Sequence, residues 1–114
     1  MIEPEKPKIK IDDFFKVDIR MGTVLQATRA EGSDKLLKLQ IDFGTEKRQI
    51  LTAMAPYFSP EHFIGKQIMA IINVDIKKMR GHESHGIIIA AENADGSPTL
   101  LHPEKEVPNG SRVI

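Results

Sequence analysis

The sequence predicts an all-β protein built as a small five-stranded barrel with extra strands at its C-terminal end. Three observations support this prediction. Short apolar or alternating segments recur along the chain, glycine, proline, asparagine and aspartate separate them, and one compact helix-start signal lies between the third and fourth segments. Several short strands at regular spacing, with one short helix between the third and fourth, indicate a small closed barrel.

The N-terminal segment, residues 1–10, is charged and contains two prolines, so we expect an extended arm before a single domain of residues 11–114. A short helical turn is expected to follow, with Asp12 as its N-cap. The side chain of Phe14 or Phe15 should then pack against one end of the core and close it.

Each predicted strand follows from its own pattern. The clearest is residues 37–43, where apolar side chains alternate with polar ones, and Gly22 indicates a bulge or bend in the first strand. The short helix is indicated by Ser59 at the N-cap and Pro60 at the first helical position, and Gly65 ends it. The five predicted strands cover residues 17–27, 37–43, 47–53, 66–74 and 87–91, with a hairpin turn at 93–98 and a short strand at 99–102. A Greek-key barrel with a helix after strand three is the oligonucleotide/oligosaccharide-binding (OB) plan.

The composition narrows the possible functions. The chain has 114 residues, and its 16 Lys and Arg balance its 16 Asp and Glu, so binding to a polyanion would have to come from local clustering of charge. The chain contains no cysteine, which is typical of a protein in a reducing compartment. Because the N-terminus has no apolar core and every apolar run is short, we expect a cytoplasmic protein without a signal peptide or membrane span.

Positive charge concentrates in one segment between the two last apolar strands. Lys77, Lys78 and Arg80 occur there within four residues, closely followed by His82 and His85. A loop held between buried strands presents its charges in a fixed geometry that suits a phosphate backbone. The alternative is an ordinary solvated hairpin loop.

Catalytic signatures are missing from the sequence. The histidines lack the spacing of a helical metal motif, no cysteine accompanies them, and no glycine-rich phosphate loop or nucleophile elbow is present. His82, Glu83 and His85 could form part of a metal site, but exposed loop histidines explain them more simply. We therefore predict a protein that is not an enzyme and needs no cofactor or metal.

Aromatic residues are too few for a general single-strand binder, which stacks bases on exposed rings. Tyr57 and Phe58 form the only candidate platform, and packing of the loop before the helix is the alternative for both. A protein that reads the shape of a folded RNA needs a rigid array of cations instead. Barrel topology would place Arg48 and Lys35 beside the basic loop, although each could equally be a solvated charge at a strand edge.

Four segments in order resemble the structure-specific tRNA-binding domain: residues 13–22 (DFFKVDIRMG), 33–39 (SDKLLKL), 48–53 (RQILTA) and 77–86 (KKMRGHESHG). This family includes the C-terminal domains of many methionyl-tRNA synthetases, free-standing beta subunits, the endothelial monocyte-activating polypeptide and the CsaA chaperone. The resemblance runs from about Ile11 to Ile114. It implies a non-catalytic OB-fold, a homodimer, and binding to the outer corner of tRNA by shape.

The resemblance also implies site residues. The family's binding loop and its flanking basic positions correspond here to Lys35, Arg48, Asn73, Lys77, Lys78, Arg80, Ser84 and Gly86. Two departures occur, because the family usually has methionine where this chain has Ile87, and serine-glycine where it has Thr52-Ala53. Thr52 keeps a hydroxyl group and Ile87 keeps the bulk.

These observations predict a stand-alone tRNA-binding protein, such as a methionyl-tRNA synthetase beta subunit or an equivalent factor acting in trans, with the synthetase's catalytic subunit as a further candidate partner. A CsaA-like chaperone that binds unfolded precursors is the alternative, and a bare assembly module is a third. We also expect a homodimer whose interface uses residues 1–12 and the C-terminal strands, because Ile9, Ile11, Val113 and Ile114 are apolar and those segments are too thin to form a core alone.

Overall fold

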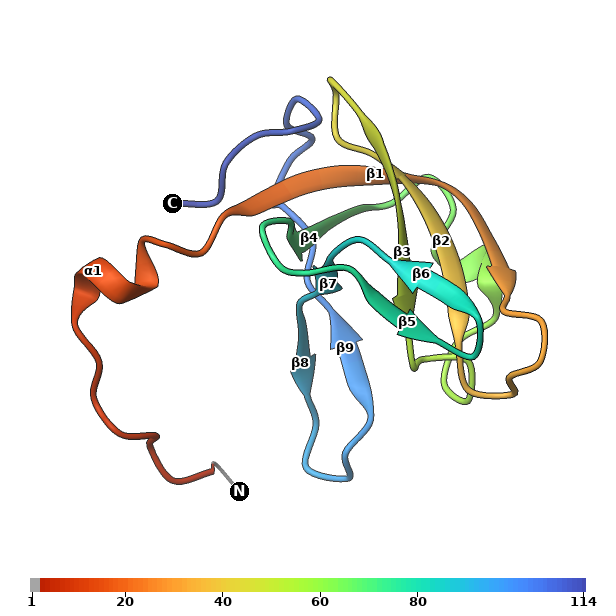
Figure 1. Ribbon diagram of the computed structural model, residues 1–114, viewed down its shortest axis with the longest axis horizontal. Coiled ribbons are helices and arrows are strands. Elements are labelled where there is room, and N and C mark those ends of the chain that lie inside the picture. Colours follow the sequence, from red (N-terminus) through yellow and green to blue (C-terminus); the bar gives the residue numbers. More distant parts are fainter. Residues whose placement is uncertain (1–2) are drawn as a thin grey trace.

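The structure is a computed structural model that describes residues 3–114. Its main feature is an antiparallel sheet of five strands in the order β3-β2-β1-β4-β7, which curls into a nearly closed barrel (Figure 1). These strands are β1 (Ile19–Arg29), β2 (Leu37–Asp42), β3 (Lys47–Thr52), β4 (Gln67–Ile71) and β7 (Ile87–Ile88). The predicted all-β, OB-like fold class is confirmed.

Two small hairpins and two short helices complete the fold. Hairpin β5–β6 lies between β4 and β7, and hairpin β8–β9 follows β7. Their strands are β5 (Lys77–Met79), β6 (His82–Ser84), β8 (Ala90–Glu92) and β9 (Pro98–Leu100), and the helices are α1 (Ile11–Phe14) and the 3-10 helix η1 (Pro60–His62).

The predicted fifth strand, residues 87–91, is divided in the structure. Ile87 and Ile88 pair with β4, and the amide of Ile89 still donates to the carbonyl of Met69 at 3.1 Å. From Ala90 onward the chain pairs with β9 instead. An unbroken apolar run carries no signal for this change of partner.

No helix among the described residues has both the length and the apolar character that crossing a bilayer requires.

The core lies inside the barrel and follows the alternation that the sequence shows. Leu37, Leu39 and Ile41 of β2 are completely buried, and they pack with Ile50 of β3 and with Phe63, which follows η1. Burial of a side chain of this size stabilises the fold by about 1.5–3 kcal/mol. The strand predicted most clearly is therefore the centre of the core.

Gly22 lies where the barrel wall is crowded. A Cβ atom at this position would lie 2.6 Å from Cγ2 of Ile41 and 2.8 Å from the Phe43 ring. The irregular pairing of β1 lies further along, between Val24 and Gln26. The predicted bulge in the first strand is therefore present just beyond Gly22, and Gly22 itself is needed for close packing.

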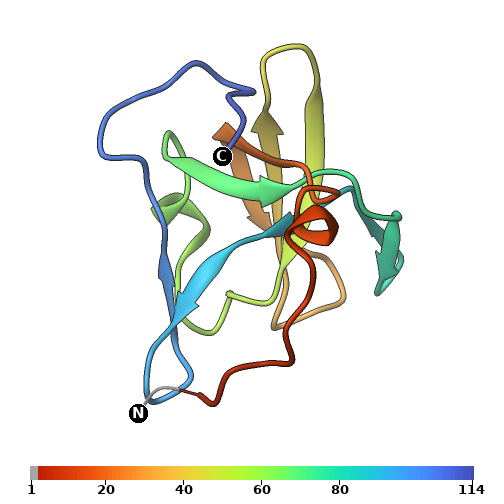
Figure 2. The same cartoon turned by 90° about the vertical axis from the view of Figure 1, so that its left-hand side faces the viewer.

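The N-terminal predictions need two corrections. The N-cap of α1 is Lys10, which makes no side-chain capping bond, and Asp12 lies inside the helix. Phe14 and Phe15 are 51% and 71% exposed and do not fill the core. Figures 1 and 2 show the reason, since α1 projects away from the barrel. Residues 1 and 2 of the expected arm lie outside the described part of the chain.

Candidate nucleic-acid interface

The basic segment that the sequence predicts as a loop is a regular hairpin. Met79 pairs with His82, so Arg80 and Gly81 alone form the turn, and their φ angles are +52° and +82°. Two consecutive positive φ angles define a type I′ turn, which matches the twist of the flanking strands. The hairpin therefore presents the Arg80 side chain at its tip, at a backbone conformation that disfavours arginine.

The hairpin has an inner and an outer face because strand side chains alternate. Met79 is on the inner face, where it packs against Ala30, Leu36 and Leu51. Lys78, the residue before Met79, pairs in register with Glu83, and its side chain is therefore directed to the outer face. The inner face thus packs against the barrel, while the outer face presents charged side chains to solvent.

Hydrogen bonds fasten the hairpin to β3. The Gln49 side-chain amide donates to the Glu83 carbonyl at 2.9 Å, and the Gln49 carbonyl accepts from the His85 amide at 2.8 Å. The buried Ser84 hydroxyl accepts from the Leu51 amide at 2.9 Å and donates to the Gly86 carbonyl at 3.0 Å. The cationic hairpin is therefore held rigidly on the barrel.

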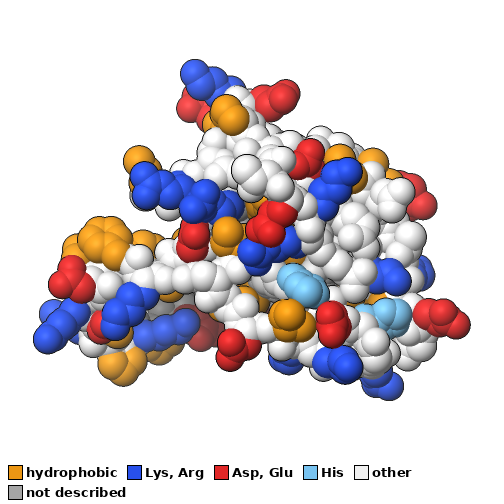
Figure 3. Space-filling model, turned by 45° about the horizontal axis from the view of Figure 1, so that its top comes forward, with side chains coloured by type: hydrophobic (Ala, Val, Ile, Leu, Met, Phe, Trp, Pro, Cys, Tyr) orange, Lys and Arg blue, Asp and Glu red, His pale blue; other side chains and the backbone are white. Residues whose placement is uncertain are grey.

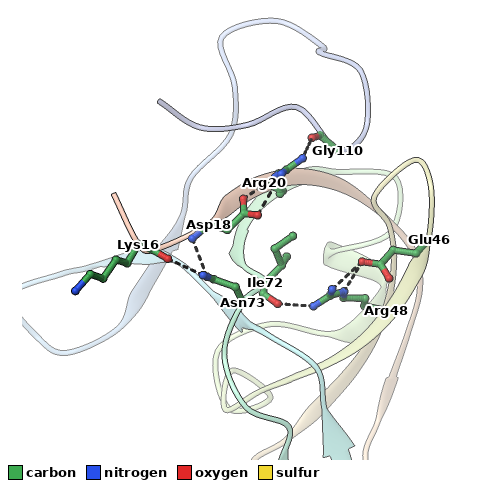
Figure 4. Close-up of polar contacts among 8 residues, drawn as sticks. All are labelled: Lys16, Asp18, Arg20, Glu46, Arg48, Ile72, Asn73 and Gly110. Atoms are coloured by element: carbon green, nitrogen blue, oxygen red, sulfur yellow. Dashed lines mark hydrogen bonds and ion pairs between the residues drawn. The ribbon is translucent and has the colours of Figure 1, made fainter. Parts of the chain in front are cut away.

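Arg48 occupies a different position from the hairpin cations. It pairs in register with the buried Ile41, so its side chain projects toward the barrel interior, while Gln49 and Leu51 project toward the hairpin. Its guanidinium donates to the carbonyl of Ile72 (Figure 4) and also to the carbonyl of His85. Arg48 therefore reaches the foot of the hairpin, at His85, but its guanidinium is engaged by backbone carbonyls.

The same guanidinium is paired with Glu46, at 2.7 Å from Nη2 and 2.8 Å from Nε, and the Arg48 side chain is 23% exposed. With these partners in place, Arg48 links β3 to the ends of β4 and β6. A direct contact between Arg48 and RNA stays a prediction, and it would require the Glu46 pair to open.

Asn73 and Gly86 also have structural partners. The Asn73 side chain accepts from the Asp18 amide at 2.7 Å and donates to the Lys16 carbonyl at 2.6 Å, which joins the start of β1 to the end of β4 (Figure 4). A Cβ atom on Gly86 would lie 2.8 Å from the Ile71 carbonyl oxygen. Gly86 is thus required where two strands approach closely.

Four of the eight predicted site residues are exposed cations: Lys35, Lys77, Lys78 and Arg80. No carboxylate pairs with any of them in the part of the chain that the structure describes. Lys35 precedes Leu36, which packs near Met79, so it lies beside the hairpin. These cations remain available to a partner.

Sequence reasoning missed Lys38. It pairs in register with Leu51, so its side chain shares the sheet face that the hairpin covers. In the sequence it appears only as the solvated half of an alternating strand. Figure 3 shows basic side chains interspersed with acidic ones on one face of the molecule, as expected for a chain whose 16 Lys and Arg balance 16 Asp and Glu.

Asp18 and Arg20 form an ion pair beside the Asn73 bridge, with 2.6 Å between Oδ1 and Nε (Figure 4). The hydrogen bond from Arg20 holds the pKa of the Asp18 carboxyl below its ordinary value of 3.8, partly opposed by burial. Arg20 also donates to the Gly110 carbonyl at 3.2 Å. The pair therefore connects β1 to the C-terminal segment.

The remaining candidates have local partners. A ring nitrogen of His82 lies 2.8 Å from the Glu31 carbonyl, and one of His85 lies 3.2 Å from the Glu83 carboxylate. Among residues 3–114, no group of three or more acidic or histidine side chains is arranged to hold a metal ion. Phe58 stacks on His62 with ring centroids 4.5 Å apart, while Tyr57 is exposed.

This geometry describes a binding barrel with a rigid cationic hairpin. Residues 19–112 match the family described as "Putative tRNA binding domain", and the chain belongs to that family. The resemblance found in the sequence is confirmed.

Relatives and solved structures agree with this assignment. The methionine–tRNA ligase of Parabacteroides distasonis is 45% identical over 97% of this chain, and that of Methanothrix thermoacetophila is 47% identical over 96%. This chain spans 16% of the length of each of these ligases. It matches one module of these much longer proteins.

Two solved structures have similar folds over their full length. A MetRS-related protein from Pyrococcus horikoshii has a TM-score of 0.91 and 38% identity, covering 96% of this chain and 100% of its own. The chaperone CsaA from Bacillus anthracis has a TM-score of 0.85 and 30% identity, covering 95% and 100%. Similar folds thus occur both in a MetRS-related protein and in a chaperone.

Proposed function

We propose that this chain is a non-catalytic tRNA-binding protein that grips the sugar–phosphate backbone of a folded tRNA. It would serve as a methionyl-tRNA synthetase beta subunit or as a factor acting in trans, in the cytoplasm. The observation that carries the proposal is the set of exposed cations on the β5–β6 hairpin, which no carboxylate of residues 3–114 pairs with. The buried Ser84 and the partly buried Met79 fix this hairpin against the barrel.

The mechanism follows from electrostatics. Cations on a fixed surface release counterions from the phosphates they neutralise, so affinity falls steeply as salt concentration rises. Because side chains that contact phosphates carry no base information, recognition would depend on whether the RNA shape brings several phosphates to the hairpin together.

The test is the double variant Lys78→Ala with Arg80→Ala. It should weaken binding to total tRNA and reduce the salt slope, d log K/d log[salt], by about two, at about one per lost phosphate contact. The matched control is Lys66→Ala with Lys105→Ala, which removes the same charge from another part of the surface. Unchanged tRNA affinity and slope in the hairpin variant would contradict the proposal.

We further propose that the protein is a homodimer whose interface uses residues 1–12 and the C-terminal strands, together with the exposed Phe14 and Phe15 that follow. Ile11 is 70% exposed and Phe15 is 71% exposed. Hydrophobic side chains gather on the projecting N-terminal segment at the left of Figure 3. A hollow of about 500 Å³ lies between this arm and the C-terminal residues Arg112, Val113 and Ile114. Exposed apolar surface of this kind is typical of an interaction site.

Light scattering tests the dimer. The wild type should have twice the 12.8 kDa mass of one chain at micromolar concentration. Phe14→Ser with Phe15→Ser should shift it toward the monomer mass, and Ile64→Ser, which changes an exposed apolar residue beyond η1, should not. A wild type that has the mass of a single chain would exclude the dimer.

A chaperone role is the second candidate, supported by the CsaA likeness and by the same exposed apolar arm. A filter-binding competition between folded tRNA and a denatured protein client separates the two functions. Preference for the client would favour the chaperone. Co-purification with a catalytic synthetase subunit, without affinity for tRNA alone, would favour an assembly module.

A further inference from the structure

A pocket of about 360 Å³ lies between the inner face of the β5–β6 hairpin and the end of β3. Its walls include Leu36, Leu51, Met79 and Ile87, and Thr52, Asp75 and Lys77 contribute polar groups. Its position, between the hairpin and the β1–β2 loop, is where loops of an OB barrel meet over strands two and three.

We propose that this pocket takes one unstacked nucleobase from the bound RNA. The inference rests on the proposed function, because the hairpin cations would bring the RNA to the pocket. Its volume is at the lower end of the range for small-molecule sites and is large enough for one nucleobase. The site would add base selectivity to a surface that otherwise reads shape.

The walls suit a flat apolar ring. Leu36 and Leu51 form a buried cluster, and Met79 packs against it with a flexible, polarisable thioether that adapts to aromatic rings. At the pocket wall Ile87 is 52% exposed, although it is large and apolar. A base inserted here would cover apolar surface that water contacts in the free protein.

Thr52 supplies a hydroxyl that has no partner of its own. The residue is 9% exposed, and no hydrogen bond from its side chain is found within residues 3–114. Every fully buried side-chain nitrogen or oxygen in the described part of the chain has a partner, so this hydroxyl reaches the protein surface, and Thr52 is one of the residues that line the pocket. The Ser84 hydroxyl, by contrast, is already engaged by Leu51 and Gly86.

Asp75 gives the pocket a preference. An ionised carboxylate only accepts hydrogen bonds, so it favours a base edge rich in N–H donors. Guanine presents two adjacent donors on its Watson–Crick edge, whereas uracil has one donor between two carbonyls.

Mononucleotides test the pocket directly. Protein labelled at Ile, Leu and Met methyl groups is titrated with 5′-GMP, 5′-AMP, 5′-CMP, 5′-UMP and ribose 5-phosphate and followed by NMR. We expect saturable shifts at Leu36, Leu51, Met79 and Ile87, largest with 5′-GMP and smallest with 5′-UMP, and none at Ile64. Equal shifts with ribose 5-phosphate, or shifts with a denatured polypeptide but with no nucleotide, would overturn the proposal.

Variants give a second readout. Asp75→Asn should weaken binding of 5′-GMP and of tRNA about tenfold, and Thr52→Val about threefold, because each removes hydrogen bonds to the base. Glu104→Gln, which removes the same charge elsewhere, should leave binding unchanged. Tighter tRNA binding by Asp75→Asn is what phosphate attraction alone would give, and it would refute the base contact.

The two proposals fail differently. If the protein binds 5′-GMP in the pocket but binds no tRNA, the proposed function is wrong and the pocket remains a nucleotide site. If tRNA binds with the expected salt dependence while no mononucleotide shifts the NMR signals of the pocket methyl groups, the proposed function holds and the proposed base pocket is wrong.

Discussion

The Ser84 hydroxyl accepts a hydrogen bond from the Leu51 amide at 2.9 Å and so joins the cationic hairpin to the barrel. The same hydroxyl donates to the Gly86 carbonyl, and Ser84 is buried. A single small side chain thus satisfies two backbone groups at the seam between β3 and β6. This arrangement explains how a charged hairpin can be rigid.

We predict that Ser84→Ala destabilises the protein by about 1–3 kcal/mol, because both backbone groups lose their partner in a buried setting. Urea unfolding measures this free energy. Ser59→Ala is the control, since Ser59 makes no side-chain capping bond at η1, and it should change stability by less than about 0.5 kcal/mol. If the two variants lowered the free energy of unfolding equally, the Ser84 hydroxyl would not be important for holding β6 against β3.

Arg80→Asn should move stability and binding in opposite directions. Asparagine tolerates the positive φ of +52° better than arginine, so thermal or urea unfolding should show a gain of about 1 kcal/mol. Affinity for tRNA should fall, because the tip of the hairpin loses its cation. Lys105→Asn is the control, because it removes a positive charge at a residue that does not form this turn. It should change neither the stability nor the affinity for tRNA. A variant that is both less stable and fully active would contradict this description of the turn.

Arg48→Lys should weaken the barrel seam by about 1–3 kcal/mol, because lysine cannot reproduce the fork that reaches Glu46 and two carbonyls. Chemical denaturation of Arg48→Lys, Glu46→Gln and the double variant measures the interaction free energy between Arg48 and Glu46.

If Arg48 acts only through the fold, Arg48→Gln should lower tRNA affinity by the same factor at every salt concentration. A salt slope reduced by about one would instead indicate a direct phosphate contact.

The Asp18–Arg20 pair predicts a specific pH dependence. Because the folded-state pKa of Asp18 is lowered, the pair contributes stability above about pH 4 and loses it as the pH falls through the folded-state pKa. The stability difference between wild type and Asp18→Asn should therefore be constant near neutral pH and shrink in acid. Urea unfolding at a series of pH values tests this, and a difference that widens in acid would have the wrong sign.

The sequence predicted most of the barrel because its strands carry strong local signals. Alternation in residues 37–43 fixes which side of β2 is buried, and the Ser59-Pro60 signal and Gly65 mark the helical turn. Predictions failed where the outcome depends on what lies opposite in space. Phe14 and Phe15 look like core residues in sequence, but Phe43 and Phe63 already fill the barrel.

For the candidate site, the sequence located the cations but not their arrangement. The clustering of Lys77, Lys78 and Arg80 is a property of the sequence alone, as is the family resemblance that the comparison with the tRNA-binding domain confirms. That Arg48 projects toward the barrel interior follows from register, which depends on pairing between β2 and β3. The pocket beneath the hairpin likewise exists only because β3, β6 and β7 converge.

The sequence by itself determined the barrel, the local concentration of charge and the family, because apolar periodicity, turn residues and motif order are all local properties of the chain. Tertiary structure alone decided which polar groups remain available to a partner. Ser84, Asn73 and Arg48 have their hydrogen-bonding groups engaged across the seam, while Lys77, Lys78 and Arg80 are left exposed. The physical reason is that a hydrogen bond between distant segments forms only once the packed core has brought them together.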